Sequence, residues 1–251
     1  MKHAVNIGRI AAQLLRSDQP QESVKLAALA VQLKPGDEGL WSMLAEAQLR
    51  SGQINAAAVS LARAKELSPN KAELWFAEAS LALRTNHPET AVDLLGQGLK
   101  LDPDNAYAYF DLGNARIMKS QLRLALKAFE KATVIEPSFW EALNNQALVL
   151  FEMGSYSEAI RRWRCALEIN ASPEAMLALA AALNSGQPGD REAIDLAVNA
   201  LATDPNYVLT SYQKSHLWGL QLRWATERLL WEPMLRASVN SAEGTTDPDS
   251  G

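Results

Sequence analysis

The side chains that most often do chemistry in proteins are few in this chain and lie far apart. The histidines are His3, His87 and His216, and none stands beside a carboxylate at a spacing suited to a metal ion. A single cysteine, Cys165, cannot form an internal disulfide or a cysteine-rich zinc site. We therefore predict no metal site and no cofactor.

Motifs for phosphate binding or nucleophilic catalysis are also missing from the sequence. Gly96 and Gly98 stand one residue apart, but they fall inside a helix-like stretch and do not follow a strand. No serine lies in a nucleophile elbow. We predict no catalytic residues and no enzymatic activity. Cys165 precedes a helix-packing position, and we expect its thiol to be buried as a small apolar group.

Three arginines surround one tryptophan, in the order Arg161, Arg162, Trp163 and Arg164. Such a cluster could contact an acidic partner or nucleic acid. The whole chain is acidic, however, with a formal net charge of -5 and an isoelectric point near 5.3. We predict no nucleic-acid binding and interpret the arginines as a solvated helix face.

Composition and hydropathy indicate a folded protein outside the membrane. Hydrophobic residues make up 48% of the chain and charged residues 21%. The longest apolar stretch, residues 175–183, has nine residues, whereas a membrane-spanning helix needs roughly 20. Asn6, Arg9 and Gln13 interrupt the apolar residues near the N-terminus, so no signal-peptide core forms. We predict a cytoplasmic protein with no membrane insertion.

The elements that must position any site recur with a period of 34 residues. Pro35, Pro69, Pro103 and Pro137 each follow a helix-like stretch, and Pro205 lies two periods beyond the last of them. Counting back from these prolines divides residues 4–207 into six repeats: 4–37, 38–71, 72–105, 106–139, 140–173 and 174–207.

Large and small apolar residues occupy fixed positions in every repeat. The eighth position is always small: Ala11, Ala45, Ala79, Gly113, Ala147 and Ala181. The fourth is always large and apolar, and the twentieth and twenty-seventh are always small. Two antiparallel helices approach closely only where small side chains face each other. The pattern therefore predicts a packed helical hairpin in each repeat.

The fourth repeat carries a set of residues typical of one family: Tyr109, Leu112, Gly113, Ala125, Phe129, Ala132 and Pro137. With these residues the sequence resembles the tetratricopeptide repeat (TPR) family, whose signature is Trp-x2-Leu-Gly-x2-Tyr, then Ala-x3-Phe, then Pro. The resemblance recurs over residues 4–207. It implies an all-α fold, a right-handed superhelical solenoid of six antiparallel helix pairs.

Beyond residue 207 the period ends, and residues 209–231 read as one long helix stopped by Pro233. We predict a capping helix over 208–232, with a stripe of Trp218, Leu222, Ala225 and Leu229 covering the sixth repeat. A second stripe could pair two copies of the chain into a homodimer: Leu217, Leu220, Trp224 and Trp231. Residues 238–251 have little to bury, so we expect a disordered tail there.

In TPR proteins the first helix of each repeat lines a concave groove, and the resemblance places ten candidate partner-binding residues there: Phe76, Leu83, Tyr107, Phe110, Asn114, Ile117, Met118, Asn144, Leu148 and Phe151. Aromatic and apolar groups clustered at such positions favour binding of an apolar or aromatic peptide segment. Tyr107 and Phe110 are the expected anchors, while Asn114 and Asn144 could bind a peptide backbone. The alternative is that the C-terminal helix or tail covers these residues.

Two further expectations follow from the resemblance. One TPR subclass clamps a partner's C-terminal carboxylate with lysine and arginine at positions five and nine, where this chain has pairs such as Gly8 with Ala12 and Phe76 with Ser80. We therefore predict no chaperone-type carboxylate clamp. Residues 212–219 resemble the capping region of cyanobacterial and plastid TPR proteins. An alternative hypothesis is an assembly factor for a multiprotein complex such as a photosynthetic one.

Overall fold

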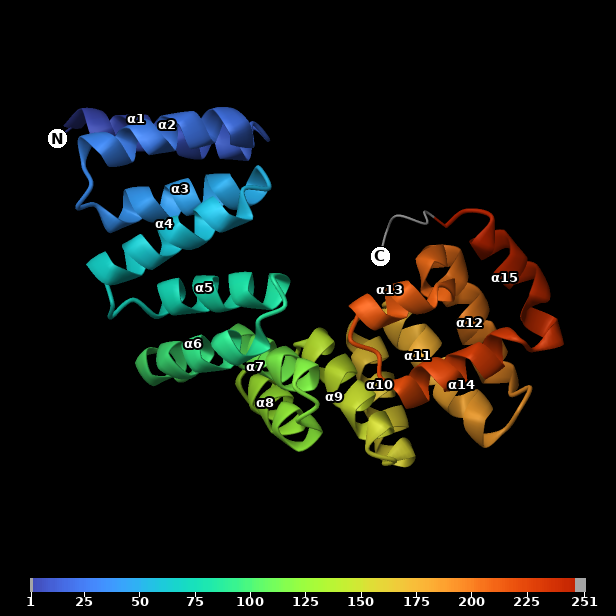
Figure 1. Ribbon diagram of the computed structural model, residues 1–251. Helices are drawn as coiled ribbons and strands as arrows, with labels where there is room; N and C mark the ends of the chain where they lie inside the picture. The colour runs from blue at the N-terminus through green and yellow to red at the C-terminus, as the bar shows by residue number, and fades with distance from the viewer. Residues whose placement is uncertain (1, 247–251) are drawn as a thin grey trace. The chain divides into compact units, whose positions relative to one another are not determined.

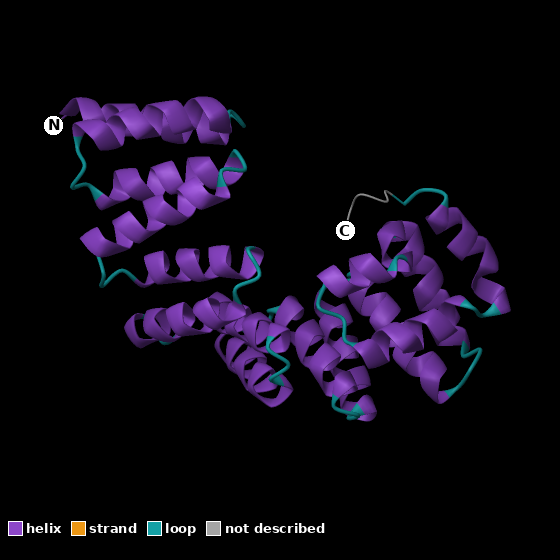
Figure 2. Cartoon of the chain, in the orientation of Figure 1, coloured by secondary structure: helices purple, strands orange, loops and turns teal. Residues whose placement is uncertain are grey.

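The computed structural model describes residues 2–246, and the regular secondary structure in that range is helical (Figure 2). Twelve helices follow one another in pairs (Figure 1): α1 (Lys2–Arg16) with α2 (Pro20–Leu33), α3 (Glu38–Arg50) with α4 (Ile54–Leu67), α5 (Ala72–Arg84) with α6 (Pro88–Leu101), α7 (Ala106–Met118) with α8 (Leu122–Ile135), α9 (Trp140–Glu152) with α10 (Tyr156–Ile169), and α11 (Pro173–Gly186) with α12 (Arg191–Thr203). The all-α prediction is confirmed.

The helices keep the 34-residue register of the sequence. Helices α3, α5, α7 and α9 begin at residues 38, 72, 106 and 140. The turns inside the first five pairs repeat as well, because each has one residue with a positive φ at the same position: Asp18, Gly52, Asn86, Ser120 and Gly154. This left-handed conformation favours Gly, Asn and Asp. Four of the five turns therefore carry a residue suited to the required backbone.

The small residues of the repeat lie where two helices touch. Residues at the eighth, twentieth and twenty-seventh positions are buried in all six repeats. A Cβ atom added to Gly98 would lie 2.4 Å from the ring of Phe76, and one added to Gly113 would lie 2.3 Å from the ring of Phe129. These two glycines thus make room for an aromatic ring of the neighbouring helix.

The chain forms two compact units, residues 1–108 and residues 109–251. The N-terminal unit packs around small apolar clusters that include Ala11, Ala27 and Leu44, and Ala45 with Leu61 and Leu81. The C-terminal unit contains a larger core in which the fully buried Trp163 is joined by residues of the C-terminal segment.

That C-terminal segment differs from the predicted single helix. It consists of η1 (Pro205–Val208), α13 (Thr210–Ser215), α14 (Leu220–Leu230), η2 (Pro233–Leu235) and α15 (Arg236–Glu243). The chain breaks between α13 and α14, where Leu217 has a φ of 63°. The break lets the Trp218 side chain enter the core, where it is 3% exposed.

The expected disordered tail is wrong for residues 238–243, which belong to α15. Leu235 and Ala242 anchor this part of the chain, with 0% and 3% of their surfaces exposed. Their burial supplies the apolar contacts that composition alone did not suggest. Residues 247–251 of the expected tail lie outside the described residues. Over the described range, no helix has both the length and the apolar character needed to cross a membrane.

Candidate protein-binding surface

The residues predicted to line a groove fall into both units. In the N-terminal unit, Phe76 and Leu83 are half-buried, and Tyr107 at the start of α7 is 64% exposed. In the C-terminal unit, Ile117 and Met118 are half-buried near the end of α7. These five side chains keep part of their surface at the solvent.

Phe110, expected as an open anchor, is half-buried and its ring packs against other aromatic rings of the chain. Its ring centroid lies 5.1 Å from that of Phe139 and 5.7 Å from that of Phe129. Phe129 is fully buried, and Phe110 packs against its cluster together with Ile117. The aromatic ring therefore contributes mainly to the packing of α7 on its neighbours.

The two asparagines expected to hold a peptide backbone are engaged within the protein. Asn144 is 1% exposed and its Oδ1 accepts a hydrogen bond of 3.1 Å from the indole of Trp163. Its Nδ2 donates to Asn145, whose own Nδ2 donates to Asn114 Oδ1 at 2.9 Å. Because burial requires polar groups to be paired, this asparagine chain serves the interior. Asn144 is not accessible to a partner in this structure.

Leu148 and Phe151 are covered by the chain's own C-terminal segment. They are 2% and 3% exposed and share one core with Leu222 and Leu229 of α14. Helix α14 packs mainly on α11 and also on α9, the first helices of the sixth and fifth repeats. Covering by the C-terminal helix was the alternative to partner binding, and for these two residues it is what the structure shows.

A carboxylate of α9 holds the start of α14 in place. Glu152 Oε1 accepts a hydrogen bond of 2.9 Å from the Leu222 amide, and Oε2 accepts one of 3.2 Å from the Gln221 amide. A Cβ at Gly219 would lie 2.1 Å from Glu152 Cδ, so the missing side chain permits the approach. Tyr156 also donates to Gln221 Oε1 at 3.1 Å.

Glu174, a buried acid on α11, binds the segment that joins α13 to α14. The Trp218 indole donates a hydrogen bond of 2.9 Å to Glu174 Oε1. Burial raises the pKa of Glu174 above its usual value, while the bond from Trp218 and the nearby His216 act in the opposite direction. The His216 ring contacts the rings of Tyr207 and Tyr212 at tilted angles. Among the described residues no group of His, Cys, Asp and Glu is arranged to hold a metal ion.

An open apolar groove, here called the Trp224 groove, lies beside α14 in the C-terminal unit. Its volume is about 1020 Å³. Helices α9, α10, α11 and α14 each contribute apolar side chains to its wall: Phe151, Tyr156, Ile160, Ala182, Trp224 and Ala225. Tyr156 and Trp224 are 49% and 58% exposed and stand at the solvent. Glu227 and Arg228 bring one charge of each sign to the edge.

The stripe predicted to pair two copies of the chain does not form one continuous face of α14. Leu220, Trp224 and Trp231 are 49%, 58% and 81% exposed, as a docking surface requires. Leu217 lies before α14 with its positive φ and is half-buried, so it does not continue the face of that helix. Sequence reasoning also kept Phe151 and Trp224 in separate hypotheses, although both line the Trp224 groove.

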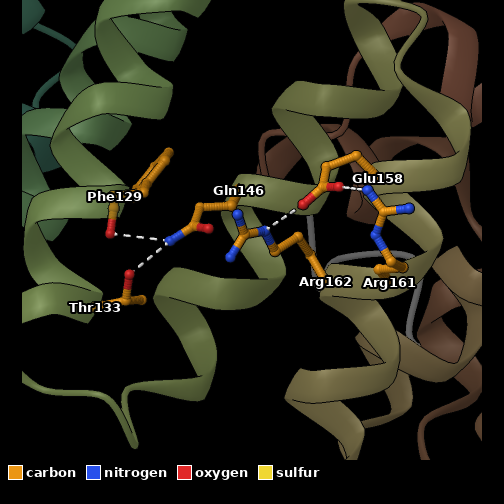
Figure 3. A network of polar contacts seen from close by, with 6 residues as sticks. All are labelled: Phe129, Thr133, Gln146, Glu158, Arg161 and Arg162. Atoms are coloured by element: carbon orange, nitrogen blue, oxygen red, sulfur yellow. Dashed lines mark hydrogen bonds and ion pairs between the residues drawn. The ribbon is translucent and has the colours of Figure 1, made fainter.

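The arginine cluster is paired with acids of the same chain. Arg161 and Arg162 both bond Glu158, and Arg164 bonds Glu192 at 2.9 Å. Figure 3 shows Arg162 extending from α10 in the direction of Gln146, whose Nε2 donates to Phe129 O and Thr133 Oγ1.

The expected burial of Cys165, next to this cluster on α10, is wrong, because its thiol is exposed. Successive helical residues point about 100° apart, so its neighbour Ala166 packs while Cys165 does not.

Comparison with known proteins agrees with this architecture. The sequence model of the tetratricopeptide repeat family matches residues 76–138 and 119–164. Residues 76–164 therefore contain tetratricopeptide repeats. Beyond that stretch, α1 to α4 and α11 to α12 continue the same helix pairs. No curated protein sequence matches the chain.

Several solved structures share the fold at low sequence identity. MamA 41-end from Desulfovibrio magneticus RS-1 is 18% identical, with a TM-score of 0.64 over 67% of this chain and 95% of that one. YrrB, described as a TPR protein with an unusual peptide-binding site, is 15% identical, with a TM-score of 0.60 over 73% and 92%. PilF of Pseudomonas aeruginosa is 13% identical, with a TM-score of 0.68 over 89% and 96%.

Proposed function

We propose that this TPR chain is a non-catalytic scaffold that binds an apolar or aromatic segment of another protein in the Trp224 groove. The observation that carries the proposal is that the exposed aromatic side chains of Tyr156 and Trp224, from α10 and α14, line one open apolar groove. The peptide-binding site named for the structurally similar YrrB supports protein binding as the general activity.

The openness and chemistry of the groove favour a protein segment over a small molecule. Small-molecule sites bury most of the surface of their ligand, whereas this groove is open to the solvent. Tyrosine and tryptophan are enriched among the residues that dominate binding energy at protein interfaces. Tyr156 and Trp224 offer such side chains from two different helices, α10 and α14.

The test is to compare the partners of three variants recovered from a lysate of the source organism. Trp224→Ala and Tyr156→Ala each remove one groove side chain. Trp231→Ala removes an equally large and more exposed side chain, at 81%, that does not line the groove. We expect a partner that wild type and Trp231→Ala retain and that both groove variants lose. Equal recovery by all four proteins would show that the groove is not the binding site.

Self-association is a second candidate, favoured by the exposure of Leu220, Trp224 and Trp231 on one segment. Exposed aromatic groups of this kind could form a symmetric interface between two copies. Light scattering of wild type and Trp231→Glu tests it, since a dimer through this segment should become a monomer in the variant. A monomeric wild type would exclude this candidate.

An assembly factor for a multiprotein complex would use the same groove. The identity of the captured partner separates that role from a general adaptor, because an assembly factor should recover subunits of one complex. A cytoplasmic location remains a prediction, and fractionation of the source cells tests it.

A further inference from the structure

A second groove lies in the N-terminal unit and is separate from the Trp224 groove. Its apolar side chains come from α3, α4 and α5: Leu49, Leu61, Leu74 and Ala77. Leu61 and Leu74 are 4% and 5% exposed and so form its floor. The volume is about 490 Å³, which suits one or two side chains of a partner better than a whole helix.

Acidic groups surround this apolar floor. Glu38, Glu46 and Glu73 all line the groove, and Lys71 is the basic residue among its lining. Glu38 and Glu46 are eight residues apart on α3 with Ser42 between them, so the three share one face of the helix. The groove therefore carries more negative than positive charge.

The positive charge of Lys71 is already paired with an acid that lines the same groove. Its ammonium group pairs with Glu38 Oε2, while Glu38 Oε1 accepts a hydrogen bond of 2.8 Å from Ser42. The pair raises the pKa of Lys71 above its ordinary value, chiefly through the hydrogen bond to Glu38. Glu46 and Glu73 are exposed and form no salt bridge with another described residue, although the Glu73 carboxylate also attracts Lys71 at longer range. Neither carboxylate is thus in direct contact with a cation of the described chain.

We propose that this acid-lined groove binds a second protein segment through a lysine or arginine side chain. The aliphatic stem of that side chain would cover Leu61 and Leu74, and its charged head would lie beside Glu46 and Glu73. Lysine and arginine combine an apolar stem with a charged head that remains hydrated. An acidic or purely apolar segment would match only part of the groove, so charge complementarity selects the occupant.

The experiment uses two fluorescein-labelled nine-residue peptides, one alternating leucine with lysine and one alternating leucine with glutamate. Fluorescence anisotropy measures their affinity for the full-length protein in low salt and in physiological salt. We expect the lysine peptide to bind, and to bind more weakly as salt screens the charges. The glutamate peptide should not bind.

Matched variants separate the groove from the general acidity of the chain. Glu46→Gln/Glu73→Gln keeps the size and polarity of both side chains and should weaken binding about 10-fold or more. Glu22→Gln/Glu66→Gln removes the same charge from exposed sites on α2 and α4 and should change affinity less than about twofold. Circular dichroism checks that both variants are folded.

Several outcomes would overturn the proposal: no binding of the lysine peptide, equal binding of the two peptides, or equal losses in the two double variants. Trp224→Ala separates it from the function proposed above. Unchanged affinity in that variant places the lysine peptide away from the Trp224 groove, as expected here. A loss in that variant would instead assign the peptide to the Trp224 groove and exclude the acid-lined one.

Discussion

The carboxylate of Glu152 caps a helix that begins far along the chain, through a bond of 2.9 Å from the Leu222 amide. Helix α14 has Gly219 at its own N-cap and receives no side-chain hydrogen bond from it. A negative group at this end also interacts favourably with the positive end of the helix dipole. The docking of α14 on α9 thus depends on a polar contact as well as on apolar burial.

Replacing Glu152 with Ala should loosen α14. Loss of a capping side chain costs about 0.5–2 kcal/mol of stability, so urea unfolding should show a loss in that range. Hydrogen exchange should be faster at the α14 amides than in wild type. Glu168→Ala, at an exposed site on α10, serves as the control. Unchanged exchange at Gln221 and Leu222 in the Glu152 variant would contradict the cap.

Gly96 and Gly98 of α6 should respond to alanine in opposite directions. A Cβ at Gly96 has no neighbour within 4 Å, so alanine should stabilise the helix by about 0.5–1 kcal/mol. A Cβ at Gly98 would lie 2.4 Å from the ring of Phe76, and overpacking of this kind costs about 1–3 kcal/mol. Thermal unfolding of Gly96→Ala and Gly98→Ala measures the two changes in stability. Changes of the same sign would refute the packing of Phe76 on Gly98.

Asp111 should make stability depend on pH. Burial raises the pKa of this carboxyl from 3.8 to about 6. The folded protein therefore holds the proton to higher pH than the unfolded chain, and stability falls as pH rises from about 4 to 6. Asp111→Asn removes the free-energy cost of burying a charged carboxylate. At pH 7 the free energy of unfolding of this variant should therefore exceed that of wild type by on the order of 1–3 kcal/mol.

Urea unfolding at pH 4 and pH 7 checks this expectation, because the difference between the two proteins should shrink at the lower pH. A constant difference at both pH values would mean that Asp111 titrates as an ordinary exposed carboxyl.

Ser120 occupies the left-handed position of the turn between α7 and α8, with a φ of 57°. The matching turns have Gly52 and Gly154 at this position. Ser120→Gly should stabilise the protein by about 0.5–1 kcal/mol, since a side chain is unfavourable in this conformation. Gly154→Ser should destabilise it by a similar amount. Denaturant unfolding gives the free energy of unfolding of each variant. A change in the same direction for both variants would contradict the turn geometry.

The period of 34 residues and the small residues at fixed positions were sufficient to predict the helix pairs. Such features are readable because each small residue marks a close helix contact within one local hairpin. The buried Ala11 and Ala45, at the same position of successive repeats, are examples. A short-range steric requirement leaves a direct trace in residue type.

The candidate site depends on long-range contacts of the C-terminal segment, and residue type alone does not indicate such contacts. The apolar residues of 209–231 allowed one long helix, and only the tertiary structure shows a break at Leu217 that brings Trp218 to Glu174. Likewise, the type of Leu148 or Phe151 cannot tell whether a partner or α14 covers it, because both provide the same apolar burial. The sequence alone determined the repeat and its helix pairs. Long-range docking of α14 decided which apolar side chains are hidden and which, such as Trp224, remain at the surface.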